Sequence, residues 1–292
     1  MRTESAEKMT TTTDPLPTLD LPAEPVPVGG DGAVRAELRG HVLLVTIDRP
    51  EARNAVNRAV TIGIGDALEI ADQRSDIWVV IITGAGDRAF CAGADLKAAA
   101  AGELGVDGDE RRAAWGFAGF VSHHVSTPII AAVNGFALGG GTEITLASDL
   151  AVAADSAAFG LPEVSRGIVA GAGGAFRLPR AIPEKVALEA ILTGRPLTAQ
   201  RALELGLVNR VVPLAELLPA AFALADDIVR NAPLAVQMSK RIAKGISDGV
   251  IADESDDWHR SNEEVATIMS SADAREGLRA FAEKRAPRWE GK

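Results

Sequence analysis

Two glutamates stand out because each lies beside a glycine-rich segment that is expected to begin a helix. Glu143 follows three consecutive glycines, 139 to 141, and Glu163 precedes the glycine-rich segment 171–174. Carboxyl groups can move protons in general acid–base catalysis. A glutamate near a helix N-terminus can also simply stabilise the helix, by roughly 0.3–1 kcal/mol. Either residue alone fits both interpretations, whereas the pair favours chemistry.

Two backbone amides near these glutamates could stabilise negative charge on an oxygen atom. Small residues around Gly93 let the backbone pass close to a ligand and expose the amide of Ala94. The amide of Gly140 is expected at a helix N-terminus, where free N–H groups and the helix dipole favour an anion. An oxyanion hole requires such donors. Ala94 and Gly140 are therefore candidate oxyanion donors.

The composition excludes several other kinds of chemistry. The 292 residues carry 40 acidic and 30 basic side chains, a formal net charge of −10, so we expect no nucleic-acid partner. A single cysteine, Cys91, permits no internal disulfide and no cysteine-based metal cluster; we expect a packed thiol and no metal site. The absence of tyrosine excludes mechanisms that use a tyrosine acid, such as that of the short-chain dehydrogenases.

The N-terminal residues and the hydropathy of the chain predict a cytoplasmic protein. No apolar run reaches the ~18–20 residues that cross a bilayer, so we expect no membrane span. The first twenty residues are polar and acidic, unlike a secretory signal.

Three further patterns resemble functional motifs, but their context argues against each. Gly84 to Ala89 fits the dinucleotide pattern G-x-G-x-x-[GA], yet no helix is expected to begin at its second glycine. Gly245 to Gly249 fits G-x-S-x-G, yet it follows a predicted helix and not a strand. His123 and His124 are adjacent on a predicted helix, so they point about 100° apart and favour a polar helix end.

The predicted elements form a repeating α/β region followed by helices. A strand, a glycine-rich turn and a helix recur, and beyond about residue 183 almost only helical periodicity remains. We expect a hairpin at 33–38 and 41–47, buried strands at 77–82, 128–133 and 150–154, and helices at 57–73, 111–124, 143–147, 183–192, 199–205, 214–230, 234–244, 255–269 and 273–284.

From about Val34 to its C-terminus the sequence resembles the crotonase, or enoyl-CoA hydratase/isomerase, superfamily. The match is close at three segments, AFCAGADLK (89–97), AVNGFALGGGTE (132–143) and FGLPE (159–163). The resemblance implies an α/β crotonase-like spiral of repeated ββα units with a helical C-terminal region. Its implied organisation is a flexible tail at 1–31, a spiral core at 32–225, and an oligomerisation and site-closing region at 226–292. A homotrimer or a dimer of trimers is expected.

The same resemblance implies a hydro-lyase that reversibly adds water to a 2-enoyl-CoA and gives a 3-hydroxyacyl-CoA. Ala94 and Gly140 would bind the thioester oxygen, Glu143 would activate water, and Glu163 would protonate C2. Isomerases of the family typically need only the glutamate that matches Glu163, so the presence of both favours hydration. The alternatives are a 3,2-enoyl-CoA isomerase, a carnitinyl-CoA-type dehydratase and a non-catalytic CoA-thioester-binding subunit; a nicotinamide-dependent dehydrogenase is a more distant one.

The resemblance also implies where the acyl-CoA thioester binds. No cofactor is expected, because coenzyme A is part of the substrate. One sequence departure is Ala170, where many hydratases have proline; it touches none of the assigned catalytic groups. The implied CoA contacts are Arg53, Ala55, Ala92, Asp95, Leu96 and Lys97, with Phe281 and Lys284 near the end of the chain.

Overall fold

Two β-sheets form the centre of the structure, a computed structural model that describes residues 17–292 except 101 and 107. The first sheet is antiparallel along β1, β2 and β3 and parallel from β3 through β4, β6, β8 and β11. Its strands, in spatial order, are β1 (Glu24–Val26), β2 (Val34–Arg39), β3 (Val42–Ile47), β4 (Val79–Gly84), β6 (Ile129–Val133), β8 (Leu150–Ala154) and β11 (Arg210–Val212).

The second sheet repeats the order of the first. Each of its three parallel strands follows one strand of the first sheet after a short turn, and a helix comes next, which is the ββα repeat that the sequence predicts. In spatial order the strands are β10 (Leu197–Thr198), β9 (Ala158–Gly160), β7 (Phe136–Leu138) and β5 (Ala89–Cys91). The α/β crotonase fold is thereby confirmed.

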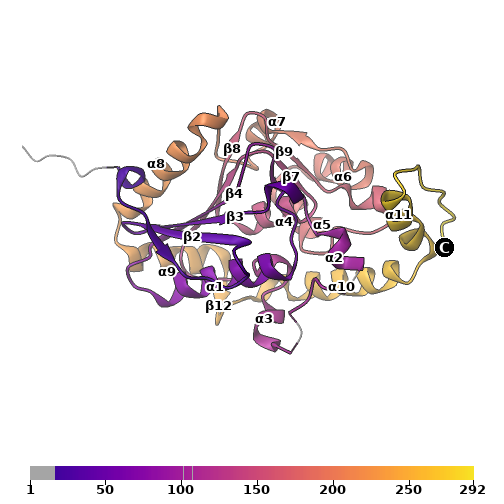
Figure 1. The fold of residues 1–292 in the computed structure, drawn as a ribbon, viewed down its shortest axis with the longest axis horizontal. Coiled ribbons are helices and arrows are strands. Elements are labelled where there is room, and N and C mark those ends of the chain that lie inside the picture. Colours follow the sequence, from indigo (N-terminus) through magenta and orange to yellow (C-terminus); the bar gives the residue numbers. More distant parts are fainter. Residues whose placement is uncertain (1–16, 101, 107) are drawn as a thin grey trace, which may run out of the picture.

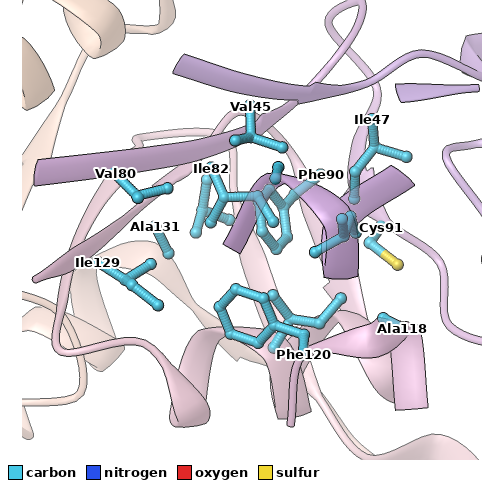
Figure 2. Packing of buried hydrophobic residues seen from close by; sticks show 14 of the residues in the cluster. Val45, Ile47, Val80, Ile82, Phe90, Cys91, Ala118, Phe120, Ile129 and Ala131 are labelled. Carbon is cyan, nitrogen blue, oxygen red and sulfur yellow. The ribbon is translucent and has the colours of Figure 1, made fainter. Parts of the chain in front are cut away.

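Helix α1 (Arg58–Gln73) covers one face of the first sheet and α8 (Leu217–Val229) covers the other. The side chain of Asn57 caps α1 by accepting the Val60 N–H, and the predicted i, i+3, i+4 face of α1 is buried. Figure 2 shows how the core beneath the first sheet is filled, with the Phe90 ring near Ile47 and Ile82 and the Phe120 ring on its other side. The start of the second sheet is thus anchored in the main core.

The remaining helices lie mainly in the second half of the chain. Figure 1 shows the C-terminal helices α10 and α11 at the end of the molecule away from α8. No helix among the residues that the structure describes is long and apolar enough to cross a membrane. The helices are α2 (Leu96–Ala100), α3 (Glu110–Ala114), α4 (Gly140–Ala147), α5 (Gly174–Ala181), α6 (Glu184–Thr193), α7 (Ala199–Glu204), α9 (Pro233–Lys244), α10 (Ser255–Met269) and α11 (Ala272–Ala282).

The N-terminal region differs from the predicted tail. Residues 24–26 form β1, which pairs antiparallel with β2, and residues 18–20 form a short 3₁₀ helix. Pro25 is compatible with this strand because β1 is the edge of its sheet, where a missing N–H is tolerated. Residues 1–16 lie outside the described residues. The predicted boundary after residue 225 falls within the continuous helix α8.

The predicted helix at 111–124 is wrong beyond Ala114. Gly116, Ala118 and Gly119 have φ values of 72°, 61° and 63°, which end α3 and leave only a 3₁₀ turn, Phe117–Gly119. The histidines that follow are therefore not at a polar helix end. His123 is buried and stacks on Trp115 with ring centroids 4.4 Å apart.

Asn54 connects the turn before α1 to both sheets, and its replacement tests that connection. Fully buried, it accepts the Arg49 N–H and donates to the carbonyl oxygens of Ala85 and Ala89, at 2.7–3.0 Å. Asn54→Ala leaves the Arg49 N–H and Ala85 O without this partner, and Ala89 O with only the longer bond from Asn134 (3.3 Å), so we expect a loss of about 2–4 kcal/mol in unfolding free energy. Urea unfolding at one protein concentration measures it.

The control is Asn231→Ala, because Asn231 is exposed and bonds only helix-end carbonyls. It should cost less than about 0.5 kcal/mol. Equal losses from the two variants would show that the Asn54 contacts do not stabilise the fold.

Candidate active site

The two candidate oxyanion donors are brought together by a close backbone approach. A Cβ atom on Gly93 would lie 3.1 Å from the Leu138 carbonyl oxygen and 3.2 Å from the Gly140 nitrogen. The segment that contains Ala94 therefore lies against the start of α4, and only a residue without a side chain permits this contact.

The amide of Ala94 points away from the neighbouring strand. Residue 94 forms a parallel bridge with Val56, in which the Val56 N–H donates to Gly93 O and the Asp95 N–H donates to Val56 O, both at 2.8 Å. In such a bridge the central residue directs its own N–H to the opposite side. That N–H is thus directed away from Val56.

Gly140 is the first residue of α4, so its N–H belongs to the unpaired first turn of the helix. The ring of Phe117 lies directly on it, since a Cβ atom on Gly140 would be 2.2 Å from Phe117 Cε1. The ring leaves no space for a side chain at this position.

Glu143 lies in the first turn of α4 and is only 3% exposed. Its Oε1 accepts the Gly174 N–H at 2.9 Å, so the glycine-rich start of α5 orients the carboxyl group. Burial raises the pKa of Glu143 to about 7, although hydrogen bonds from Gly174 and Ala172 and the charge of Arg177 act to lower it. A carboxyl group with such a pKa can exchange protons near neutral pH.

Glu163 lies in the 3₁₀ helix η4 (Pro162–Arg166) and is directed at the residue before Gly140. Its Oε1 would be 2.7 Å from a Cβ atom on Gly139, and its Oε2 is buried without a hydrogen-bond partner. The pKa of Glu163 is raised to about 8, mainly by burial and to a lesser extent by the charge of Glu143. The two carboxyl groups interact electrostatically beside the start of α4.

Most of the residues expected to contact CoA are grouped in the structure. The Ala92 N–H donates to Arg53 O at 3.1 Å, and Arg53 adopts a left-handed conformation in the turn that leads to Ala55. Asp95 accepts an Arg49 hydrogen bond at 3.0 Å and caps the start of α2, whose first residues are Leu96 and the exposed Lys97. The Arg53–Ala55 turn and the Ala92–Lys97 segment therefore lie side by side.

Phe281 lies on a different element, α11, and Lys284 follows the end of that helix in a left-handed conformation. Phe281 is 43% exposed, and its ring receives the Arg166 guanidinium at 4.2 Å from the centroid. Helix α11 packs against η4 and α10, so Phe281 lies close to the element of Glu163. None of the contacts described for α11 joins it to the Arg53–Ala55 turn.

The structure also accounts for the motifs that the sequence sets aside. Cys91 is a packed thiol, as predicted, and burial raises its pKa to about 12. Gly84 is the last residue of β4 and Gly86 lies in the turn that leads to β5, with no helix at the second glycine. Gly245 caps the C-terminus of α9, as expected for a helix terminus.

Comparison with known proteins identifies the family. Residues 37–292 match the family model described as enoyl-CoA hydratase/isomerase. The chain belongs to this family. As a crotonase it is an enzyme, and more narrowly a hydro-lyase.

Several relatives of this crotonase carry more specific names. Carnitinyl-CoA dehydratase from Proteus mirabilis is 44% identical over 257 residues, covering 87% of this chain and 97% of that protein. A crystal structure of carnitinyl-CoA hydratase from Mycobacterium avium is 56% identical, with a TM-score of 0.86 and coverage of 89% and 99%. An enoyl-CoA hydratase structure from Mycobacterium tuberculosis H37Rv is 46% identical, with a TM-score of 0.68 and the same coverage.

Three side chains at this crotonase site were not predicted as site residues. Phe117 covers Gly140, and Arg177 and Trp258 both contact Gly173, at 3.2 Å and 3.3 Å from where its Cβ atom would lie. Arg177 is 81 residues from Trp258, so no local pattern connects them.

Replacing Glu163 should change the pH dependence of stability of this crotonase. Because the folded pKa of about 8 exceeds the ordinary value of 4.5, burial of Glu163 favours the protonated form, and stability falls as pH rises from about 4.5 to 8. Glu163→Gln removes this penalty. We expect a gain of about 1–3 kcal/mol in unfolding free energy at pH 9 relative to wild type, a gain that vanishes near pH 4.

Urea unfolding at pH 4 and at pH 9 measures this gain. The control is Glu184→Gln, an exposed position at which the unfolding free energy should stay unchanged at both pH values. A Glu163→Gln protein that is less stable than wild type at pH 9 would contradict the buried-carboxyl interpretation.

Proposed function

We propose that this hydro-lyase interconverts a 3-hydroxyacyl-CoA and its 2-enoyl-CoA, with carnitinyl-CoA as the favoured hydroxyacyl substrate. The observation that carries the reaction is the pair Glu143 and Glu163, a buried carboxyl group and a half-buried one whose Oε2 is shielded from solvent, beside the amide of Gly140. The sequence alone favours a general enoyl-CoA hydratase. Relatives at 44% and 56% identity that are named for carnitinyl-CoA support the more specialised substrate.

In this mechanism the amides of Ala94 and Gly140 bind the thioester oxygen. Removal of the C2 proton, or addition of water at C3, passes through an enolate whose negative charge is concentrated on that oxygen. Fixed N–H donors stabilise this charge without reorganising, and one such donor typically contributes ~10²–10³ in rate. The dipole at the start of α4 adds to the effect.

The two glutamates then share the proton transfers. In hydration Glu143 takes a proton from water as it attacks C3, and Glu163 delivers a proton to C2; in dehydration the roles reverse. Burial raises the pKa of both carboxyl groups, to about 7 for Glu143 and about 8 for Glu163, so near neutral pH one member of the pair can hold a proton while the other accepts one. The unpartnered Oε2 of Glu163 is free to face the substrate.

The CoA portion is proposed to bind along the Arg53–Ala55 turn and the Ala92–Lys97 segment. The Asp95 carboxylate is occupied by Arg49 and the start of α2, so it shapes the segment while backbone groups and Lys97 face the ligand. Phe281 and Lys284 lie apart from this group and are proposed to contact CoA bound to a neighbouring subunit, as the resemblance implies.

A homotrimer, or a dimer of trimers, is part of the same proposal. Leu234, Met238 and Ile242 are 66%, 50% and 83% exposed and are spaced four residues apart on α9, which makes a continuous apolar stripe. Sedimentation velocity should give a trimer or hexamer, and Met238→Glu with Ile242→Glu should shift it towards monomer. An unshifted trimer or hexamer would exclude this stripe as the interface, and a monomeric wild type would contradict the assembly.

The function is tested with a pair of substrates and a pair of variants. Purified protein is given crotonobetainyl-CoA, whose C4 carries a trimethylammonium group, and crotonyl-CoA, which lacks it; products are identified by mass. We expect water addition with a kcat/KM at least about tenfold higher for crotonobetainyl-CoA. Glu143→Gln and Glu163→Gln should each lower kcat by ~10²-fold or more, and Glu184→Gln should not.

Each other outcome selects a different function. A preference for crotonyl-CoA indicates a general enoyl-CoA hydratase. Double-bond migration that survives Glu143→Gln indicates a 3,2-enoyl-CoA isomerase. Binding of CoA thioesters without turnover of any of them indicates a non-catalytic subunit.

A further inference from the structure

Helix α10 is attached to the glycine-rich segment 171–174 that orients Glu143. Ser261 on α10 donates its hydroxyl to Gly171 O at 3.1 Å, and Val265 would be 2.4 Å from a Cβ atom on Gly171. The same segment supplies the Gly174 N–H that Glu143 accepts. A continuous series of contacts therefore leads from the C-terminal region to the carboxyl group of Glu143, which is 31 residues before Gly174 in sequence.

A buried ion pair is the strongest contact in this series. Arg177 donates from Nε and Nη2 to the two carboxylate oxygens of Glu254, at 2.9 Å and 2.6 Å, and the side chains are only 8% and 12% exposed. The backbone N–H of Arg177 donates to Gly173 O at 2.9 Å, and its guanidinium also contacts Gly173. Arg177 thus contacts the segment with both its backbone and its side chain.

One edge of the Arg177 guanidinium is left unused. Nη1 is buried without a hydrogen-bond partner, whereas Nε and Nη2 donate to Glu254. The flanking rings of Phe176 and Trp258, 5.5 Å and 5.3 Å from the guanidinium carbon, exclude solvent around it. In such surroundings a charge acts over a longer distance than it does in water.

We propose that Arg177 and Glu254, the last residue of the 3₁₀ helix η6 (Ala252–Glu254) that leads into α10, are a positioning pair, which fixes the orientation and the charge of Glu143 and makes its proton transfer depend on the docking of η6 and α10. The inference rests on the proposed function, since Glu143 is the group whose proton is moved. Neither residue touches the reacting atoms; both act through the segment 171–174 and through the electrostatic field at Glu143.

The charged groups around Glu143 set the direction of the expected effects. Glu143 interacts with Glu163 on η4, Arg177 on α5 and the neutral Cys91 thiol on β5. Arg177 in turn interacts with Glu254 and with His124, whose pKa is lowered to about 4 by burial, so this histidine stays neutral at working pH. Loss of Arg177 should raise the pKa of Glu143, whereas loss of Glu254 should lower it by leaving the Arg177 charge uncompensated.

The experiment compares Arg177→Gln and Glu254→Gln by the pH dependence of kcat/KM on whichever enoyl-CoA the wild type hydrates. We expect the acid limb to move by about 0.5–1 pH unit to higher pH in Arg177→Gln and to lower pH in Glu254→Gln. Both variants should lower kcat about tenfold or more and change KM less than threefold.

Arg180→Gln is the matched control, because Arg180 pairs with Asp257 across the same α5–α10 contact but is 53% exposed. It should leave the acid limb in place. A shift of both test variants in the same direction, or an equal shift in Arg180→Gln, overturns the proposal, since either would reflect general loosening of α10.

A second measurement does not depend on turnover. The carboxyl ¹³C signal of Glu143, assigned by its absence in Glu143→Gln, is titrated in wild type and in both variants. Opposite shifts of its pKa support the positioning pair even if no enoyl-CoA is hydrated, which would defeat only the proposed function. If the pKa of Glu143 is the same in the wild type and in both variants, the proposed positioning role of Arg177 and Glu254 is wrong.

Discussion

Close contact between successive turns of the backbone is the constraint on which the rest of the structure depends. A Cβ atom on Gly93 would crowd the Gly140 nitrogen, and one on Gly141 would lie 2.1 Å from Cys91 O. The second sheet and the start of α4 can approach each other only because these positions carry no side chain. The same approach brings the segment of Ala94 to the free N–H groups at the start of α4, so the proposed oxyanion donors depend on this packing.

That tight packing also determines the electrostatics. Water is excluded where the backbone is crowded, so Glu143 and Glu163 are both driven towards the protonated form, and each opposes the ionisation of the other. Backbone dipoles and one buried guanidinium, Arg177, are the groups that oppose this effect. The proposed site thus keeps a proton available near neutral pH and offers neutral N–H donors to the thioester oxygen of the proposed substrate.

Many of the strands and helices could be predicted from the sequence, and there are physical reasons why the others could not. Apolar runs predicted the buried strands, and the 3.6-residue period predicted α1, because both patterns are local. The end of α3 does have a sequence signal, since Gly116 follows the C-cap Trp115 with a φ of 72°, whereas the left-handed conformation of Ala118 has none. The prolines before residue 31 predict a tail, but an edge strand accepts proline, and residues 24–26 form the edge strand β1.

At the candidate site, too, local motifs can be predicted from the sequence, whereas contacts between distant residues cannot. The candidate glutamates and amide donors lie in short motifs, so the sequence alone suffices to predict them as site residues. Arg177 and Glu254 are 77 residues apart and meet only in the fold.

The burial of Cys91 has a practical consequence for spectroscopy. With a pKa of about 12 and no exposure, its thiol is almost never ionised at neutral pH and is inaccessible to maleimides. Because the sequence holds no other cysteine, the wild-type protein is already suitable for single-site labelling. A cysteine introduced on the solvent face of α10 would carry a fluorophore or spin label alone, with no background mutations needed to follow that helix.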